Sequence, residues 1–521
     1  MHVHRLPLNE TKSFSPFFLD YISQKSELAP FYNRFPLPEN FDKQLAEKKA
    51  AFPPEQRATL HDALTRQYAG LLKAEAVERN IDALRGEHAF TVTTGHQLNI
   101  FTGPLYFIFK IITVINACRE LRARYPQYTF VPVFWMASED HDYEEISSFR
   151  LLGKKITWAT EQHGAVGRFS TAGLSDIARE LPAAAAFFAD AYARNKTLAA
   201  AVRQYVSHLF GQDGLVVIDG DDVALKKTFA LIAGQELFHS RSHSLVEKQN
   251  AALEKLGYPA QVFSRPINLF YLADDVRARI ERAGDSFVVV DHAKRFTEAE
   301  IRHELATHPE RFSPNVILRP VYQELILPNL AYCGGPAEMV YWLQLKGVFD
   351  HAGVPFPILL PRNFAMVLPA PVAKKWEKTG MTWAELFEDK NFLHNQWMLR
   401  NAELPLSLGQ ELSATRTLYD QVQQHAATID ASLVRMVAAA AKRAVDGLET
   451  IEHKFLRAAK RHQRDKLQQI DAVKDALFPN GSLQERTDSF LNFYLEDPYF
   501  LDRLREHLDP FDFRFTLLHY T

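Results

Sequence analysis

The stretch that decides the fold runs from residue 90 to residue 146 and reads FTVTTGHQLNIFTGPLYFIFKIITVINACRELRARYPQYTFVPVFWMASEDHDYEEI. It opens with β-branched residues, breaks at Gly95 and resumes as an apolar helical pattern behind Thr102-Gly103-Pro104. Proline suits a first helical turn, where its missing N–H has no partner, and Thr102 is placed to cap that helix. A second apolar run follows over 130–137. Strand, helix and strand of these lengths predict a right-handed βαβ unit with parallel strands.

A polar cluster follows each of these two strands. The first is the loop behind Gly95, and the second is Ser138-Glu139-Asp140-His141-Asp142. The carboxyl ends of parallel strands meet at one edge of a sheet, and open α/β sheets bind their ligands there. We therefore expect both clusters to border one crevice.

Bulk properties narrow the class of protein. The chain has 521 residues, a net charge of −3 and 47% hydrophobic residues, so no global field favours nucleic acid or an acidic membrane. Cys118 and Cys333 form no CxxC pair, which is typical of a reduced cytosol. The N-terminus lacks the apolar core of a signal peptide, and Lys110 interrupts the longest apolar stretch. We expect a cytoplasmic protein without a transmembrane span.

The chain divides into four predicted parts, and the fold class is α/β, with a Rossmann-like parallel-sheet core, helical insertions and a long coiled coil. The parts are an N-terminal helical segment over 1–85, the core over 86–375 with insertions near 147–213 and 224–260, a coiled coil over 376–480, and a segment over 481–521 that returns to the core. One helix is predicted over 224–256. The runs 214–219, 264–270, 286–290 and 313–318 are interpreted as further strands of the same sheet.

The coiled-coil prediction rests on spacing. From Leu412 to Ala440 the apolar positions step alternately by three and four residues, and the helical pattern continues to Phe478. This run is too long for one globular helix. Either a single helix projects and pairs with a second copy, or the chain folds back as a hairpin near Asp430-Ala431-Ser432. The basic residues over 454–466 are interpreted as a solvated helix face rather than a nucleic-acid contact.

A second informative stretch runs over 313–362. Within it, Cys333-Gly334-Gly335-Pro336 ends an extended segment and opens a helix that carries Glu338 and Tyr341. Adjacent glycines let the backbone approach a ligand, and a helix N-terminus carries about half a positive charge. We expect a second anion cradle here, with Glu338 and Tyr341 one helical turn apart in the same cleft.

Several motifs in register resemble the cysteine ligase family of bacillithiol biosynthesis, the BshC family. They are Thr94-Gly95-His96-Gln97, Phe101 to Tyr106, Phe134-Trp135 through Asp142, Asn315 through Pro320, Gly334 to Glu338 and Leu483 to Arg486. The resemblance covers nearly the whole chain. It implies a Rossmann-like core, a coiled coil used for homodimerisation, and addition of cysteine to glucosaminyl malate as the last step of the pathway. The family pattern often has glutamine where this chain has His96, which argues against His96 as an obligatory catalyst, and it does not demand cysteine at Cys333.

This chemistry requires an activated acid, because a free carboxylate is a poor electrophile, and ATP is the expected activator. The loop behind Gly95 and the following helix start offer backbone N–H groups to phosphate, as helix N-termini do. The alternative is a tight strand-to-helix turn. The predicted cofactor-binding residues are Gly95, His96, Gln97, Asn99, Thr102, Gly103, Lys110, Gly334 and Gly335.

The acidic cluster has three interpretations: an amine-binding and general-base cluster, a Mg²⁺ site of carboxylates, or an acid-rich helix cap. We predict Asp140, His141 and Glu139 as catalytic residues and assign none to a metal. Arg265 and Arg319 suit bidentate binding of a substrate carboxylate, or else form structural ion pairs. The predicted substrate-binding residues are Asp142, Arg265, Asn268, Arg319, Gln323, Glu338 and Tyr341.

Two other functions stay open at this point. One is a class I-like nucleotidyl transferase that adenylates another small acid. The other is a dimeric nucleotide-binding scaffold whose coiled coil recruits a partner. The sequence also leaves open whether the activated acid is an adenylate or an acyl phosphate, and whether Mg²⁺ is required.

Overall fold

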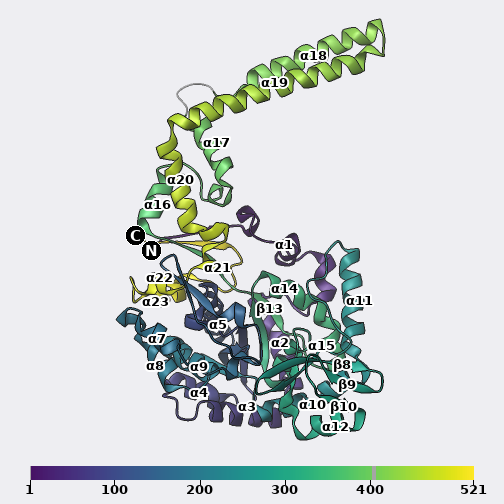
Figure 1. The fold of residues 1–521 in the computed structure, drawn as a ribbon, viewed down its shortest axis with the longest axis vertical. Coiled ribbons are helices and arrows are strands. Elements are labelled where there is room, and N and C mark those ends of the chain that lie inside the picture. The colour runs from purple at the N-terminus through teal and green to yellow at the C-terminus, as the bar shows by residue number, and fades with distance from the viewer. Residues whose placement is uncertain (1, 402–405, 521) are drawn as a thin grey trace.

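The core of the protein is a five-stranded parallel sheet, seen here in a computed structural model that describes residues 2–401 and 406–520 (Figure 1). Its spatial order is β13, β12, β2, β3, β6, and each neighbouring pair is parallel. The strands are β2 (Ala89–His96), β3 (Thr129–Met136), β6 (Val216–Asp219), β12 (Asn329–Gly334) and β13 (Ile358–Pro361). Across the sheet from β6 to β13, the strands are the third, second, first, fourth and fifth of this sheet in chain order. This is the doubly wound order, and it confirms the predicted Rossmann-like sheet.

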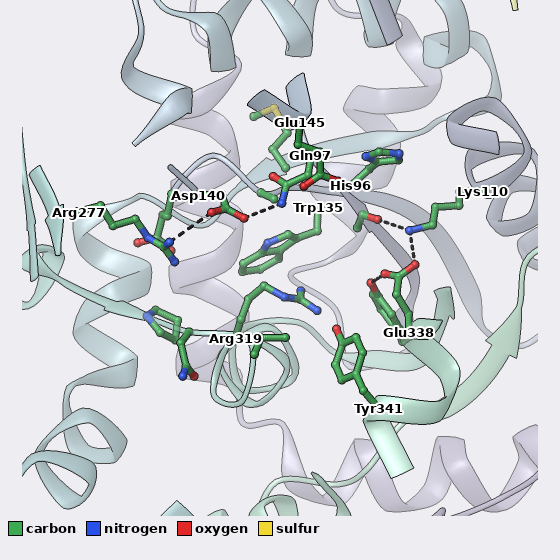
Figure 2. Close-up of a pocket in the computed structure, with 18 of the residues that line it drawn as sticks. His96, Gln97, Lys110, Trp135, Asp140, Glu145, Arg277, Arg319, Glu338 and Tyr341 are labelled. Carbon is green, nitrogen blue, oxygen red and sulfur yellow. Dashed lines mark hydrogen bonds and ion pairs between the residues drawn. The ribbon is translucent and has the colours of Figure 1, made fainter. Parts of the chain in front are cut away.

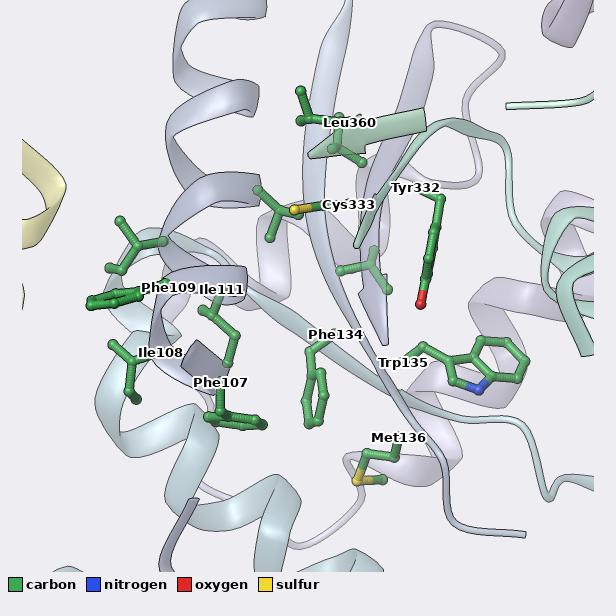
Figure 3. Packing of buried hydrophobic residues seen from close by; sticks show 14 of the residues in the cluster. Phe107, Ile108, Phe109, Ile111, Phe134, Trp135, Met136, Tyr332, Cys333 and Leu360 are labelled. Atoms are coloured by element: carbon green, nitrogen blue, oxygen red, sulfur yellow. The ribbon is translucent and has the colours of Figure 1, made fainter. Parts of the chain in front are cut away.

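Helix α5 (Tyr106–Arg124) links β2 to β3 and is buried on most sides. Figure 3 shows Phe107 and Ile111 of this helix on the side of Phe134 of β3, and Ile108 and Phe109 on the opposite side, and all five side chains are buried. An apolar surface on nearly every face gives the helix no solvent side. This helix therefore fixes the position of the loop that precedes it.

The predicted cap at Thr102 is wrong. Thr102 lies in a short 3-10 turn with φ +69°, and the residue before α5 is Leu105, without a side-chain cap. Gly103 has φ +60°, and a Cβ there would lie 2.6 Å from the Cβ of Asn99. The loop is thus a tight strand-to-helix turn, in which glycine is required by both conformation and space.

A second, antiparallel sheet packs beside the first, in the order β10, β9, β8, β7, β11. Its strands are β7 (Leu269–Ala273), β8 (Val276–Ala283), β9 (Ser286–Val289), β10 (Arg295–Thr297) and β11 (Phe312–Pro314). The prediction that the runs over 264–270, 286–290 and 313–318 extend the parallel sheet is wrong, whereas the run over 214–219 contains β6 of that sheet. Two residues join β7 to β8 and two join β8 to β9, and such short links permit only antiparallel neighbours, since a parallel crossover needs a dozen or more residues.

The helical insertions surround the core. The segment after β3 contains α6 (Tyr143–Ile146), the hairpin of β4 (Ser148–Leu151) and β5 (Lys154–Thr157), and the helices α7 (Leu174–Arg179), α8 (Ala186–Arg194) and α9 (Leu198–Phe210). The helix predicted over 224–256 is two helices, α10 (Val223–His239) and α11 (Arg241–Lys255). They are separated by Ser240, whose left-handed φ of +48° interrupts the helix.

Further helices cover the core and the N-terminal part. They are α1 (Pro16–Ile22), α2 (Phe41–Ala51), α3 (Pro54–Gln67), α4 (Glu75–Ala83), α12 (Glu298–Thr307), α13 (Arg319–Ile326), α14 (Pro336–Trp342) and α15 (Lys346–Ala352). Helices α16 (Ala370–Glu377) and α17 (Lys390–Asn401) instead pack against α20 (Arg464–Leu477), near the base of the coiled coil (Figure 1). None of the helices in the described part of the chain combines the length and apolarity that crossing a membrane requires.

The coiled coil is a hairpin. Helices α18 (Gly409–Ile429) and α19 (Leu433–His462) pack against each other, and the chain turns at residues 430–432, where the sequence offered this alternative. The pair projects away from the rest of the protein (Figure 1). Helix α20 (Arg464–Leu477) leads back, followed by α21 (Gln484–Thr487), α22 (Leu491–Tyr494) and α23 (Phe500–His507).

The two chain ends share a third sheet. Strand β15 (Phe515–His519) pairs antiparallel with β1 (His2–Leu6) and parallel with β14 (Phe364–Leu368). The end of the chain therefore lies against the strand that follows the core sheet.

Candidate active site

A cavity of about 370 Å³ lies at the carboxyl ends of the parallel strands, beside the switch point between β2 and β12 (Figure 2). The strand order reverses at this point, and ligands of doubly wound sheets bind there. The loop behind Gly95 and the acidic cluster after β3 both line this cavity, as predicted. The charged residues that line it are Lys110, Arg277 and Arg319, together with Glu139, Asp140, Glu145 and Glu338.

Lys110 and Glu338 form the first ion pair of the cavity. Lys110 Nζ lies 2.5 Å from Glu338 Oε2 and donates to the carbonyl of Gly95 at 2.8 Å. The other carboxylate oxygen accepts from the Tyr332 hydroxyl, and the Gly335 N–H donates to Oε2 at 2.9 Å. Burial opposes ionisation of Glu338, but Lys110 and the Gly335 amide outweigh it and hold its pKa below the ordinary value.

The predicted anion cradle at the two glycines is therefore occupied by the protein itself. The Gly335 amide already serves Glu338, and neither glycine lines the cavity. A Cβ on Gly334 would lie 2.6 Å from the Met339 methyl carbon, so the absence of a side chain permits close helix packing. Tyr341, one turn after Glu338, does line the cavity.

His96 is a neutral ring in this cavity. It stacks on Tyr106 with the ring centroids 5.1 Å apart, and its Nε2 is buried without a protein hydrogen-bond partner in the described structure. Burial and the nearby Lys110 charge lower the pKa of His96 to about 3. At neutral pH this side chain offers a ligand one hydrogen bond and no positive charge.

Asp140 is held by three donors. The side chain of Gln97 donates to it at 2.6 Å, the His141 N–H at 2.7 Å, and Arg277 at 3.3 Å. Burial alone would raise the pKa of Asp140. The His141 side chain, whose Nδ1 lies 3.3 Å from Asp140 Oδ1, outweighs burial together with Arg277, Gln97 and the His141 N–H, and these contacts hold the pKa well below its usual range. A carboxylate held this firmly in the ionised form is a poor proton acceptor, so Asp140 is suited to attract a cation.

The other three residues of the acidic cluster each have a different environment. Glu139 lines the cavity and pairs with the buried Lys226, and burial raises the pKa of Glu139 despite this partner. His141 lies in a neighbouring groove, with Nδ1 2.7 Å from the Arg277 guanidinium. Asp142 accepts from the Glu145 N–H at 3.2 Å and so caps α6. The helix-cap interpretation is thus right for Asp142.

Arg319 is partly buried and brings a positive charge to the cavity. Its guanidinium donates to Gln323 at 3.0 Å and lies over the Tyr332 ring. No carboxylate of the described chain lies within ion-pair distance of it, whereas Lys110 and Arg277 each have one. Gln323 was predicted to bind substrate, but it does not line the cavity. It accepts a hydrogen bond from Arg319 and so orients the Arg319 guanidinium.

Several other predicted residues do not reach the cavity. Asn268 is buried in a network with Glu236 and Ser242, which makes it structural. Thr102 and Gly103 belong to the turn below the cavity, and Arg265 lies in the neighbouring groove. The side chain of Asn99 donates to the carbonyl of Glu145 at 2.9 Å.

Two further hollows adjoin the cavity. One, of about 500 Å³, shares Tyr106 and Glu145 with it and is lined by the cations Arg150, Lys155 and Arg486. The other, of about 680 Å³, shares Arg277 and holds Arg265 and Arg279. No group of three or more His, Cys, Asp and Glu in the described chain is arranged to hold a metal ion.

Sequence reasoning missed Glu145, Arg277 and Tyr106. Glu145 lies three positions after Asp142 of the acidic cluster, and Tyr106 is the last residue of the motif that begins at Phe101. The sequence therefore contained a signal for both residues. Arg277 contacts Asp140 from 137 residues away, on a strand with no motif of its own.

A doubly wound sheet with a cavity of mixed charge at its switch point defines a Rossmann-like enzyme that binds small polar substrates. The family comparison is more specific. Residues 1–363 match the model described as the N-terminal Rossmann-like domain of bacillithiol biosynthesis BshC, and residues 365–520 match its C-terminal coiled-coil domain. The chain belongs to the BshC family.

Curated relatives agree over the full length. Proteins named "Putative cysteine ligase BshC" are 40% identical in Cytophaga hutchinsonii, over 99% of both chains, and 41% identical in Flavobacterium johnsoniae, over 97% of both. A relative of the same name in Christiangramia forsetii is 41% identical over 98% of this chain and 97% of its own. These matches confirm the resemblance and identify the chain as an enzyme of the ligase class.

Proposed function

We propose that this enzyme joins the carboxylate of cysteine to the amine of glucosaminyl malate, after ATP activates that carboxylate, to form bacillithiol. Family membership supports the cysteine ligase chemistry. The observation that carries the substrate assignment is Arg319, a partly buried guanidinium without a carboxylate partner in the described chain, in the same cavity as the ionised Asp140. An amino acid carries both charges, so Arg319 would bind its carboxylate and Asp140 its ammonium group.

ATP is proposed because amide formation needs a leaving group on the acyl carbon. Phosphorylation or adenylation of the cysteine carboxylate provides one. Further cations suited to phosphate lie beside the cavity, since Arg150, Lys155 and Arg486 line the adjoining hollow. Mg²⁺ would enter with the nucleotide as its counter-ion.

The protein thiols do not take part in this proposal. Cys118 and Cys333 are both buried, and burial raises the pKa of each to about 12. Figure 3 shows Cys333 packed in the apolar core beside Leu360. Since the thiolate is the reactive form, neither residue would trap the activated cysteine as a thioester.

We also propose a homodimer in the cytoplasm. Apolar side chains stand exposed on the α18–α19 hairpin, namely Leu418, Val422, Ile429, Met436, Ile451 and Phe455. These side chains form an apolar stripe that the projecting hairpin leaves exposed. The hairpin of a second copy of the chain would cover this stripe. Cytoplasm is proposed because ATP and reduced thiols are available there.

The test is an incubation of the purified full-length protein with ATP, cysteine and glucosaminyl malate. Mass spectrometry should detect the new thiol, and AMP or ADP would identify an adenylate or an acyl phosphate. Arg319→Gln should lose product, and the exposed Arg295→Gln should not.

ATP turnover that ignores the amine would favour the nucleotidyl transferase. Nucleotide binding without any amide product would favour the scaffold. Either result from the wild-type protein would overturn the proposed function.

A further inference from the structure

The proposed reaction needs a base. The amine of the acceptor is an ammonium ion at neutral pH, and an ammonium nitrogen has no lone pair with which to attack a carbonyl. A side chain within reach must first remove a proton. Asp140 is held in the ionised form by three donors, and His141 lies outside the central cavity, so neither predicted base suits this step.

Glu145 differs from the other three carboxylates of the cavity. Glu139 pairs with Lys226, Asp140 with Arg277, and Glu338 with Lys110. The Glu145 side chain has no hydrogen-bond or ion-pair partner among the residues that the structure describes. It is therefore the lining carboxylate that can accept a proton without breaking a contact.

Its location suits a reaction between two ligands. Glu145 and Tyr106 line both the central cavity and the adjoining hollow of about 500 Å³, so Glu145 stands at their boundary. In Figure 2 it lies on the side of Gln97 and His96, away from Tyr341. A group at this boundary reaches an amine that approaches an acyl group from either side.

The backbone of Glu145 is fixed from two directions. Its N–H donates to the Asp142 carboxylate at 3.2 Å, and its carbonyl accepts from the Asn99 side chain at 2.9 Å. Asp142 and Asn99, which the sequence suggested as ligand contacts, are positioning residues for Glu145. Only the side chain of Glu145 is left free to move toward a substrate.

The electrostatic surroundings favour proton uptake. Partial burial raises the pKa of Glu145 above its ordinary value, and the carboxylates of Asp140 and Asp142 raise it further. A base is most effective when its pKa approaches the working pH. The charged and titratable groups around Glu145 are Asp140, Asp142, Lys110, Glu338, Tyr106 and the neutral His96, with Arg150, Lys155 and Arg486 across the adjoining hollow.

We propose that Glu145 is the general base of amide formation, a role that rests on the proposed function. Its carboxylate takes one proton from the ammonium group of the acceptor. The freed lone pair forms the C–N bond to the phosphate-activated acyl carbon of cysteine, and the C–O bond to phosphate breaks with its electron pair leaving on that oxygen. The second N–H proton passes to solvent as the amide forms, and Glu145 returns its own proton to solvent.

The test compares Glu145→Gln with Glu144→Gln, since Glu144 is the neighbouring exposed carboxylate on α6 and does not line the cavity. Two steps are measured on each protein: cysteine-dependent exchange of labelled nucleotide, which reports activation, and thiol product, which reports amide formation. Glu145→Gln should keep exchange and lose amide formation by about 100-fold or more. Glu144→Gln should match the wild type in both.

The dependence of rate on pH separates a base from a structural residue. Wild-type amide formation should fall on the acid side as Glu145 becomes protonated, and Glu145→Gln should lose this limb. Glu145→Asp, which keeps a carboxylate, should retain the limb with a reduced rate. The proposal would be overturned if Glu145→Gln and Glu144→Gln formed the amide at equal rates at all pH values. It would also be overturned if Glu145→Gln lost exchange and amide formation to the same extent. A wild-type protein that makes no amide would instead overturn the proposed function.

Discussion

Arg362, directly after β13, forms a bidentate ion pair with Glu485 of α21, at 2.9 and 2.5 Å, and both side chains are fully buried. The two residues are 123 positions apart, and the whole coiled-coil hairpin lies between them. Glu485 also accepts from the Ala365 N–H on β14. This contact fixes the returning chain against the core sheet.

Replacing Glu485 by alanine should therefore destabilise the protein strongly. The change leaves the Arg362 guanidinium buried without a counter-charge, and breaking such a pair costs about 3–5 kcal/mol. Urea unfolding followed by circular dichroism measures this loss. Glu496→Ala removes an exposed carboxylate nearby and should leave the unfolding free energy unchanged. Equal stability of the two variants would contradict the assigned role.

The core sheet was predictable because its strands are buried on both faces. Continuous apolar and β-branched runs such as 130–137 identify such strands without reference to the rest of the chain. Their carboxyl ends then locate the cavity, since the doubly wound order brings polar ends to one edge. Gly95 and Asp140 were found in this way. Lys110 was found as a possible donor in the helix behind the Gly95 loop, and Arg319 as a side chain suited to a carboxylate within the motif over 315–320.

The second sheet and the cavity partners were harder for physical reasons. The links Asp274-Asp275 and Gly284-Asp285 are turn signals that exclude a parallel neighbour, and these signals were in the sequence. Arg277 is different, because its role depends on contacts with residues more than a hundred positions away. Asn268 shows the converse, since a polar residue beside a strand proved to belong to a buried network.

Replacing His96 by glutamine should make the protein less sensitive to acid. The folded pKa of about 3 lies below the ordinary value of 6.5, so the unfolded chain binds the extra proton and stability falls as the pH drops below 6.5. At pH 5 this effect amounts to about 2 kcal/mol. Glutamine does not titrate in this range, so the variant should lose about 2 kcal/mol less stability than the wild type between pH 8 and pH 5.

The measurement is urea unfolding at both pH values. His303→Gln, at an exposed position on α12, is the control and should follow the wild type. An unchanged pH dependence in His96→Gln would show that His96 is not buried in its neutral form.

Replacing Asp140 by asparagine should weaken the use of cysteine. The variant loses the negative charge proposed to bind the ammonium group of cysteine and leaves Arg277 without its partner. Charge-assisted hydrogen bonds contribute about 1.5–3 kcal/mol, which corresponds to about 10- to 100-fold in kcat/KM. Steady-state kinetics with varied cysteine measures the effect.

His141→Ala is the matched change on the neighbouring residue. Its side chain lies in the adjoining groove, with Nδ1 3.3 Å from Asp140, so the change removes one contact of that carboxylate but keeps its charge. The value of kcat/KM for cysteine should therefore fall less than in Asp140→Asn. A large loss in His141→Ala with normal activity in Asp140→Asn would reverse the roles argued for this cluster.

Placing a charge on the hairpin should break the proposed dimer. Met436 on α19 is 60% exposed and Val422 on α18 is 44% exposed, so neither apolar side chain is buried within its own hairpin. Burying a glutamate there in a dimer would desolvate a charge without a partner, which costs several kcal/mol per ion. Val422→Glu and Met436→Glu should therefore give monomers in analytical ultracentrifugation at concentrations where the wild type is a dimer. Leu231→Glu, at a position 74% exposed on α10 and away from the hairpin, should remain dimeric. Dimers that survive both hairpin changes would mean that this stripe is not the contact, and a wild type that sediments as a monomer would exclude the dimer itself.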